Sequence, residues 1–338
     1  MISTPISKTP VSKQPERRMR KAMLGGFRPR RTGWRRYTFF YLFASPWWLL
    51  GFLLLTVFPL GYAFWLSFTS FDGYTTPRWV GWQNYMEAFH DPLVWLGFQR
   101  TFLYMAIVVP LNIVGALILA LLLNRPWRAI GIFRTIYYLP SVVPIVGIAM
   151  TFQMLFNPNS GFANALLSIL HLPAVNWLAG NQAFLVLILM IAWGMGGGMI
   201  VTLAGLQTVP LELLEAANVD GANPWSRFWN VTLPLLSPVL FFELITGIIG
   251  ALQVMIQPML LVPGLVTAGQ GSSSASYVPQ SNQVYMYHVY TEVFTQGRFG
   301  YGSALIWLLF LAILLLTLLV FFFARRWVYY EVEIKGEK

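Results

Sequence analysis

Residues 304–324 read ALIWLLFLAILLLTLLVFFFA, a run of 21 residues in which Thr317 is the one polar side chain. A helix of this length crosses the hydrocarbon core of a bilayer, about 30 Å thick, because each residue adds about 1.5 Å. The composition agrees, since 57% of the 338 residues are hydrophobic and 10% are charged. A soluble domain carries about 25% charged residues. The stretch therefore predicts a membrane-spanning helix.

Five further apolar runs of about 18 residues or more predict the same kind of helix. With the run quoted above, the six are Phe39–Leu66, Phe102–Leu123, Ile136–Phe156, Ala183–Leu206, Pro238–Val262 and Ala304–Ala324. Two prolines, Pro258 and Pro263, blur the outer end of the fifth run. We expect an all-α integral membrane protein with six transmembrane helices.

The positions of the basic residues predict how these helices are oriented. If the N-terminus lies in the cytoplasm, cytoplasmic segments hold 19 of the 22 Lys and Arg residues. The outer loops then hold Arg78, Arg100 and Arg298. Positive residues accumulate on the cytoplasmic side of membrane proteins, so both termini are expected there.

Three segments make up the expected organisation. Residues 1–36 form a basic tail, predicted to be disordered and to lie against anionic membrane lipid. It contains nothing suited to reading bases, so no nucleic-acid partner is expected. Residues 37–331 form the six-helix domain with a cytoplasmic loop at 208–234, and residues 332–338 form a short cytoplasmic tail. The Gly- and Ser-rich stretch 264–276 has a flexible composition.

The sequence offers no catalytic or metal site. None of the five lysines follows a glycine, which excludes a phosphate-binding P-loop, and the chain has no cysteine. The three histidines lie apart on outer loops, and no serine stands in a Gly-x-Ser-x-Gly turn. Of the charged residues, only Glu243 lies inside a predicted span, which disfavours an ion-coupled carrier. If the chain pumps, a partner must supply the energy.

The cytoplasmic loop carries the signals of two short helices. Pro210 suits the first turn of one helix, and Gly221 ends it at a residue free to adopt positive φ. Asn223 and Pro224 suit the N-cap and first position of a second helix. Four residues of this second helix share one face: Trp225, Phe228, Trp229 and Thr232. Leu233-Pro234 is expected to stop the second helix and lead into the fifth span.

Fixed positions of this loop resemble the EAA loop of ATP-binding-cassette (ABC) importer permeases. Glu215-Ala216-Ala217, Gly221 and Leu233-Pro234 stand at the spacing of that motif, with Val231 where isoleucine is usual. Further stretches between residues 40 and 331 resemble the carbohydrate uptake class, and the C-terminal part resembles its MalF-like first permease subunit. The resemblance implies the type I importer fold and an ATPase-coupling role for Glu215, Ala216, Ala217, Asp220, Gly221, Leu233 and Pro234.

The resemblance also implies partners. The chain would pack against a second permease subunit, usually a different one. Two ATPase subunits, which bind ATP and Mg, would each grip one EAA loop, and an extracytoplasmic sugar-binding protein would deliver the solute. The chain itself would hold no cofactor and would not hydrolyse ATP. It would lie in the cytoplasmic (inner) membrane of a bacterium or archaeon.

Sugar sites of such permeases lie on core spans equivalent to the third, fourth and fifth spans here. Polar or aromatic side chains on these spans are the candidate pathway residues: Gln153, Trp193, Glu243, Gln253 and Gln257. Glu243 fits either the pathway or a hydrogen bond between helices, and Trp193 fits either the pathway or core packing. Gln253 and Gln257 lie four residues apart, which places them on one helix face.

The predicted function is import of mono- or oligosaccharides. The alternatives are import of glycerol phosphates or polyols by the same kind of permease, and an ion-coupled carrier or channel.

Overall fold

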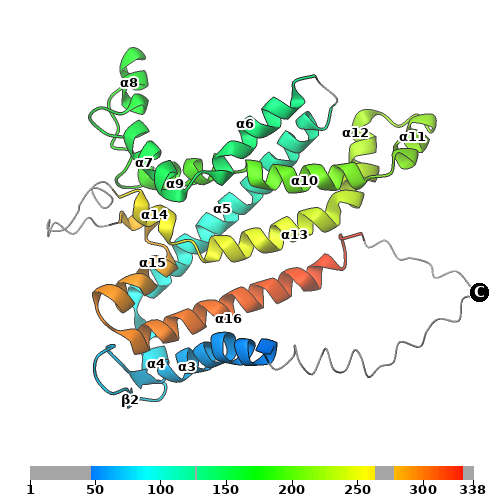
Figure 1. Cartoon of the computed structure of the whole chain (residues 1–338). Coiled ribbons are helices and arrows are strands. Elements are labelled where there is room, and N and C mark those ends of the chain that lie inside the picture. Colours follow the sequence, from blue (N-terminus) through cyan, green and yellow to red (C-terminus); the bar gives the residue numbers. More distant parts are fainter. Residues whose placement is uncertain (1–46, 126–127, 263–277, 330–338) are drawn as a thin grey trace, which may run out of the picture. The chain divides into compact units, whose positions relative to one another are not determined.

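The computed structural model describes residues 47–125, 128–262 and 278–329 (Figure 1). The predictions for the basic tail 1–36, the stretch 264–276 and the tail 332–338 lie outside these residues. In the part described, the regular structure is helical apart from one antiparallel pair of short strands, β1 (Thr69–Ser70) and β2 (Arg78–Trp79). The all-α class is therefore confirmed for this part of the chain.

Four continuous helices in these ranges are long and apolar enough to cross a membrane. They are Trp47–Leu66, α5 (Pro92–Leu123), Pro224–Leu252 and α16 (Phe299–Ala324). The first contains a π-helical turn, η1 (Leu53–Val57), followed by α3 (Phe58–Leu66). The third ends in α13 (Leu233–Leu252).

Two further helix pairs are long and apolar enough to cross a membrane only when the two helices of each pair are taken together. The first pair is α6 (Ile130–Val142) and α7 (Ile145–Leu155), bent by 96°. The second pair is α9 (Gln182–Ala192) and α10 (Gly196–Thr208), bent by 41°. The described chain thus has four to six candidate spans, and six is reached when each bent pair is counted as one span. The orientation of the termini stays a prediction.

Shorter elements connect the long helices. In chain order they are α4 (Gln83–His90), α8 (Phe162–Ile169), α11 (Leu211–Val219), α12 (Pro224–Arg227), η2 (Phe228–Thr232), α14 (Ile256–Leu260), η3 (Gln280–Asn282), α15 (Tyr285–Tyr290) and η4 (Thr291–Thr295).

The break between α6 and α7 has a local cause. Pro144 disfavours the helical conformation at the residue before it, and Val143 adopts extended backbone angles, φ −68° and ψ 135°. Pro144 is extended as well, with ψ 135°. Two successive extended residues redirect the chain, so the apolar run continues in sequence while the helix axis turns.

The break between α9 and α10 accompanies a close approach of backbones. A Cβ atom placed on Gly196 would lie 1.8 Å from the carbonyl oxygen of Tyr137 on α6. Any residue with a Cβ atom would therefore clash where α10 begins. Glycine allows the two helix backbones to come together, as small residues do in membrane proteins. The glycine run after Trp193 therefore serves packing between α6 and α10.

The core of the bundle is built around α5. This helix packs against α10, α13 and α15, and α16 packs along α13 (Figure 1). One buried cluster joins α5, α10 and α13 through Ala120, Met199, Leu203 and Leu236. Figure 1 shows α11 and α12 at one end of α13 and α14 at the other. The bundle therefore separates the 208–234 loop from the opposite face by the length of a spanning helix.

Candidate coupling loop and solute cavity

The bend of the 208–234 loop is built as predicted at its centre. Gly221 has φ +76°, in the left-handed region. The N–H of Ala222 donates to the carbonyl of Ala217 (2.9 Å), and that of Gly221 donates to Asn218 (3.1 Å). These two bonds form the Schellman arrangement that terminates a helix at glycine. Pro210 lies one residue outside its expected place, since it precedes the first helical residue with extended angles.

The second helix of the loop is capped and tied to the first. The Asn223 side chain accepts the backbone N–H of Ser226 at 2.7 Å, and Pro224 takes the first helical position, as expected. Arg227 donates a hydrogen bond to the side chain of Asn218, across the bend. These contacts cap α12 and connect it to α11 across the bend.

The expectation that Leu233-Pro234 stops this helix was wrong. Helical structure runs unbroken from Pro224 to Leu252. Pro234 has no N–H, yet the preceding π-helical turn carries the N–H of Leu233 to the carbonyl of Phe228. A π turn accommodates such a disturbance inside a helix. The loop is therefore joined rigidly to the spanning helix α13.

The loop presents an exposed apolar surface. We call it the loop surface, and it consists of Leu211, Leu213, Val219, Trp225 and Trp229. No residue of α11 is buried, and Val219 is 88% exposed. The rings of Trp225 and Trp229 meet at 5.7 Å between centroids. Exposed apolar patches of this kind are common where a protein binds another protein or a membrane.

The motif residues divide into two groups. Glu215, Ala216, Asp220 and Gly221 are exposed and Ala217 is partly exposed, all beside the loop surface. Leu233 and Pro234 are partly buried at the start of α13. The structure thus gathers the first group at the bend and places the second at the start of α13.

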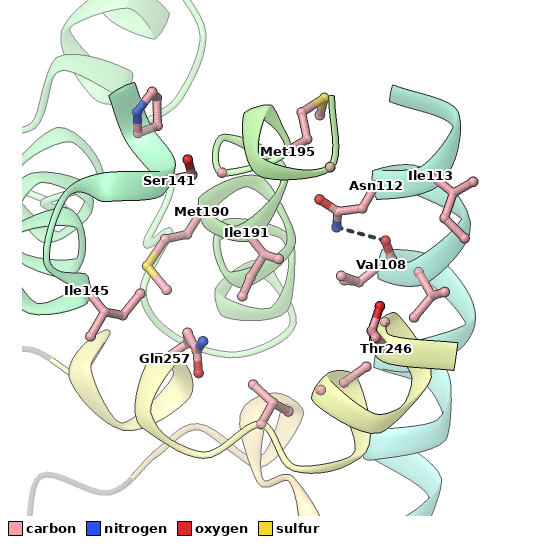
Figure 2. A pocket seen from close by; sticks show the side chains of 18 of the residues that line it. Val108, Asn112, Ile113, Ser141, Ile145, Met190, Ile191, Met195, Thr246 and Gln257 are labelled. Carbon is pink, nitrogen blue, oxygen red and sulfur yellow. Dashed lines mark hydrogen bonds between the residues drawn. The ribbon is translucent and has the colours of Figure 1, made fainter. Parts of the chain in front are cut away.

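A cavity of about 620 Å³ lies inside the bundle, walled by α5, the two bent pairs, α13 and α14 (Figure 2). Most of its lining is aliphatic or glycine. Its polar lining residues are Tyr104, Asn112, Ser141, Glu243, Thr246 and Gln257. The combination of an apolar wall with a few polar groups is typical of a small-molecule site.

Backbone carbonyls engage several of these polar groups. Asn112 donates to Val108 (2.9 Å), Ser141 to Tyr138 (2.7 Å) and Thr246 to Phe242 (2.8 Å). Each of these side chains keeps an oxygen able to accept a further bond. Glu243 accepts a hydrogen bond from Thr202 of α10 at 2.7 Å.

Two of the five candidate pathway residues, Glu243 and Gln257, line this cavity. Gln153 instead donates to the carbonyls of Leu260 (2.6 Å) and Val262 (2.9 Å), where it caps α14. The ring of Trp193 packs against that of Phe152 at an angle of 50°, with 5.8 Å between the ring centroids. Neither Gln153 nor Trp193 is among the residues that line the cavity in the described chain.

The expectation that Gln253 and Gln257 share a helix face was wrong. Helix α13 ends at Leu252, and Gln253 is exposed. Pro258 explains the break, because it cannot donate to the carbonyl four residues earlier and its ring would clash there. Gln257 reaches the cavity from the separate helix α14 (Figure 2).

Neither Tyr104 nor Asn112 was among the candidate pathway residues, yet both line the cavity. Tyr104, Val108 and Asn112 recur every four residues on α5, so they form one stripe along that helix. Glu243, Thr246 and Gly250 form the facing stripe on α13. Periodicity gives each stripe, but it does not show that the stripes face the same space.

The comparisons with known proteins agree on one family. The model described as "Binding-protein-dependent transport system inner membrane component" matches residues 112–329. The "Probable ABC transporter permease protein YesP" of Bacillus subtilis (strain 168) is 36% identical over 296 residues, covering 86% of this chain and 92% of that protein.

Two further relatives differ in the solutes that their names give. The "Lactose transport system permease protein LacF" of Rhizobium radiobacter is 32% identical over 253 residues, which cover 74% of this chain and 82% of LacF. The "sn-glycerol-3-phosphate transport system permease protein UgpA" of Yersinia enterocolitica is 30% identical over 278 residues, which cover 81% of this chain and 90% of UgpA.

The fold has a counterpart among solved structures. A chain in the crystal structure of a bacterial ABC transporter involved in the import of alginate superposes with a TM-score of 0.68 at 21% identity. The match covers 86% of this chain and 96% of that chain. This likeness shows that the two chains share the importer permease fold.

Proposed function

The chain belongs to the binding-protein-dependent inner-membrane permeases of ABC transporters, and from this premise we propose that it forms part of the route by which an ATP-driven importer moves sugars. Members of this family are non-catalytic, multi-pass components of bacterial or archaeal inner membranes, and they work with a binding protein. Family membership sets aside the alternative of an ion-coupled carrier or channel.

We propose that the bend at Gly221 docks onto an ATPase subunit in the cytoplasm. The supporting observation is the loop surface, whose apolar side chains are exposed although the two helices that carry them are capped within this chain. Glu215, Ala216, Ala217 and Asp220 would contact the ATPase beside it. Leu233-Pro234 would pass the motion into α13, because the helix is continuous there. The ATPase partner would hold ATP and Mg, and this chain would hold no cofactor.

A second permease subunit would complete the membrane domain, and two ATPase subunits would complete the motor. Much of the surface of the long helices is exposed within the single chain. In the most apolar 18-residue stretch of each helix, 28% is buried in α5 and 11% in α16. This apolar surface is available to lipid and to a second permease. The binding protein would dock on the face opposite the 208–234 loop.

We propose sugars as the solute because of the cavity lining. Hydroxyl, amide and carboxylate groups stand among aliphatic side chains in a space of about 620 Å³, which suits a small polyhydroxylated molecule. Glu243 and Gln257 are the pathway residues that this cavity supports. Gln153, Trp193 and Gln253 would contribute only if the cavity rearranged during transport. The likeness to UgpA keeps glycerol phosphate as the second candidate.

Reconstitution tests the importer assignment. Proteoliposomes containing this chain, its partner permease and the ATPase, with the binding protein outside, should accumulate a sugar only when ATP is supplied. Proteoliposomes containing this chain alone should accumulate none. Uphill transport by the chain alone, or ATP-independent uptake by the complex, would contradict the proposal.

A further inference from the structure

We propose that the cavity selects uncharged polyhydroxylated solutes, and that Glu243 is the residue that excludes anions. This inference rests on the proposed function and narrows its substrate class. It separates the two candidates left open above, because sn-glycerol-3-phosphate and acidic sugars are anions whereas most mono- and oligosaccharides are neutral.

The charge of the cavity supports this selectivity. Glu243 is the one Asp or Glu among the described residues that line it, and no Lys, Arg or His stands there. Glu243 also forms no ion pair with any residue in the described ranges. Sites that bind phosphate or carboxylate use Arg or Lys for charge-assisted bonds. This cavity offers the opposite charge.

Glu243 lies against α10. Its Oε1 atom lies 3.7 Å from the place a Cβ atom on Gly198 would occupy, in the first turn of α10. The hydroxyl of Thr202, on the same helix, donates to the same oxygen at 2.7 Å. The protein therefore gives one oxygen of this acid a hydrogen-bond partner inside the membrane domain.

The polar groups of the cavity keep hydrogen-bond donors and acceptors that hydroxyl groups of a solute can use. A carboxylate has about four acceptor positions, and Thr202 fills one. Tyr104 is 2% exposed, and its hydroxyl makes no hydrogen bond to any described residue. The Gln257 amide, which lies at the opposite wall from Asn112 (Figure 2), likewise has no side-chain partner in the described ranges. The hydroxyl groups of a neutral sugar suit such groups, since each hydroxyl both donates and accepts.

The expected selectivity follows from Coulomb's law. At roughly 7 Å from the carboxylate and an effective dielectric of about 20, one negative charge on the solute weakens binding by about 50-fold. Glu243→Gln removes this repulsion while its amide oxygen can still accept from Thr202.

The experiment has an uptake arm and a binding arm. First, the complete transporter with its binding protein is given a mixture of neutral sugars, polyols, uronates and sn-glycerol-3-phosphate, and the contents of the liposomes are identified by mass spectrometry. Second, saturation-transfer NMR measures binding of the accumulated solute, and of a uronate or phosphate of similar size, to the transporter in nanodiscs without binding protein.

We expect only neutral solutes inside the liposomes. In the binding arm, we expect wild-type transporter to prefer the neutral solute by at least about tenfold, and Glu243→Gln to reduce that ratio at least about fivefold. Asp72→Asn makes the same change of charge on an exposed outer turn and should leave the ratio unaltered.

Each contrary result has a distinct meaning. Accumulation of an anion overturns the selectivity while the importer function stands. An unchanged ratio in Glu243→Gln shows that another group selects the solute, and equal loss of both solutes assigns Glu243 a purely structural role; either result overturns the inference. If no solute accumulates with ATP, the proposed function fails and the inference fails with it.

Discussion

Gly221 offers a test that separates backbone strain from contact with the ATPase. Its φ is +76°, and nothing lies within 4 Å of a Cβ atom built on it. Substitution therefore meets no steric obstacle inside this chain, and the cost is one of backbone conformation alone. An L-residue in the left-handed region costs about 1–2 kcal/mol, less for Asn and more for a β-branched residue.

This reasoning predicts an order of three variants. A cost of about 1–2 kcal/mol lowers the ratio of bent to unbent loop by about 5–30-fold. Gly221→Asn should therefore keep the most coupling, Gly221→Ala less, and Gly221→Val the least. The measurement is the number of solute molecules imported per ATP hydrolysed in proteoliposomes, with membrane insertion and complex assembly as controls.

The Asn and Ala variants decide the matter, because Asn is the larger side chain but the better tolerated one at positive φ. If Gly221→Ala transports better than Gly221→Asn, side-chain size governs the effect, and the bend matters as a contact surface rather than as a shape. Full coupling in Gly221→Val would refute the role of the bend altogether.

Three further predictions follow from named contacts. Gly196→Ala places a Cβ atom 1.8 Å from a backbone oxygen of α6 and should cost about 3 kcal/mol, seen as a lower thermal unfolding temperature in detergent. Gly131→Ala, with nothing within 4 Å of the new atom, is its matched control. Asn164→Ala removes four hydrogen bonds that hold the 157–177 segment and should speed amide exchange there at least about tenfold. Hydrogen bonds from Thr75 hold the pKa of Asp72 at about 2. The Asp72 carboxylate should therefore stabilise the turn fully above about pH 4, the pKa of Asp in an unfolded chain, and lose this effect as the pH falls through about 2. The chemical shift of the Thr75 amide measures this titration.

Each of these predictions can fail plainly. An unfolding temperature for Gly196→Ala equal to that of Gly131→Ala would refute the close approach of α10 to α6. Unchanged amide exchange in Asn164→Ala would show that other contacts hold the segment. A Thr75 amide that titrates near pH 4 would show that the turn does not stabilise the carboxylate of Asp72.

Local signals in the sequence predicted local structure well. Gly221 and Asn223 act within a few residues of themselves, through a Schellman turn and an N-cap, and both lie where the pattern placed them. The apolar runs likewise predicted helices, because the hydropathy of a segment depends on its own residues and not on the helices that pack against it. The loop and the helical class could therefore be derived from sequence.

Prolines inside apolar runs were harder to interpret. Pro144 and Pro258 break helices, whereas Pro234 is absorbed by a π turn and Pro110 lies within α5. The difference depends on whether neighbouring turns and helices satisfy the freed carbonyl groups, and a single sequence does not contain that information. The bend in the third span was missed for this reason, whereas the fourth span bends at its glycine run, where no proline is present.

The cavity required the tertiary structure. Tyr104 on α5 and Gln257 on α14 are separated by more than 150 residues of sequence, yet they line one space. Gln153 is the same residue type as Gln257, but its side-chain amide nitrogen already donates to the carbonyl groups of Leu260 and Val262. Only the packing of the bent pairs against α13 distinguishes the two.

Site-directed cross-linking tests the central claim, which is that the 208–234 loop docks onto the ATPase in the cytoplasm. The chain contains no cysteine, so Val219→Cys, at a residue 88% exposed, and Tyr74→Cys, at one 95% exposed, each create a single thiol. In the assembled transporter, the thiol at position 219 should cross-link to the ATPase subunit, and the thiol at position 74 should react only with an impermeant reagent added outside. Labelling of position 219 from outside, or failure to cross-link within an assembled complex, would contradict the account.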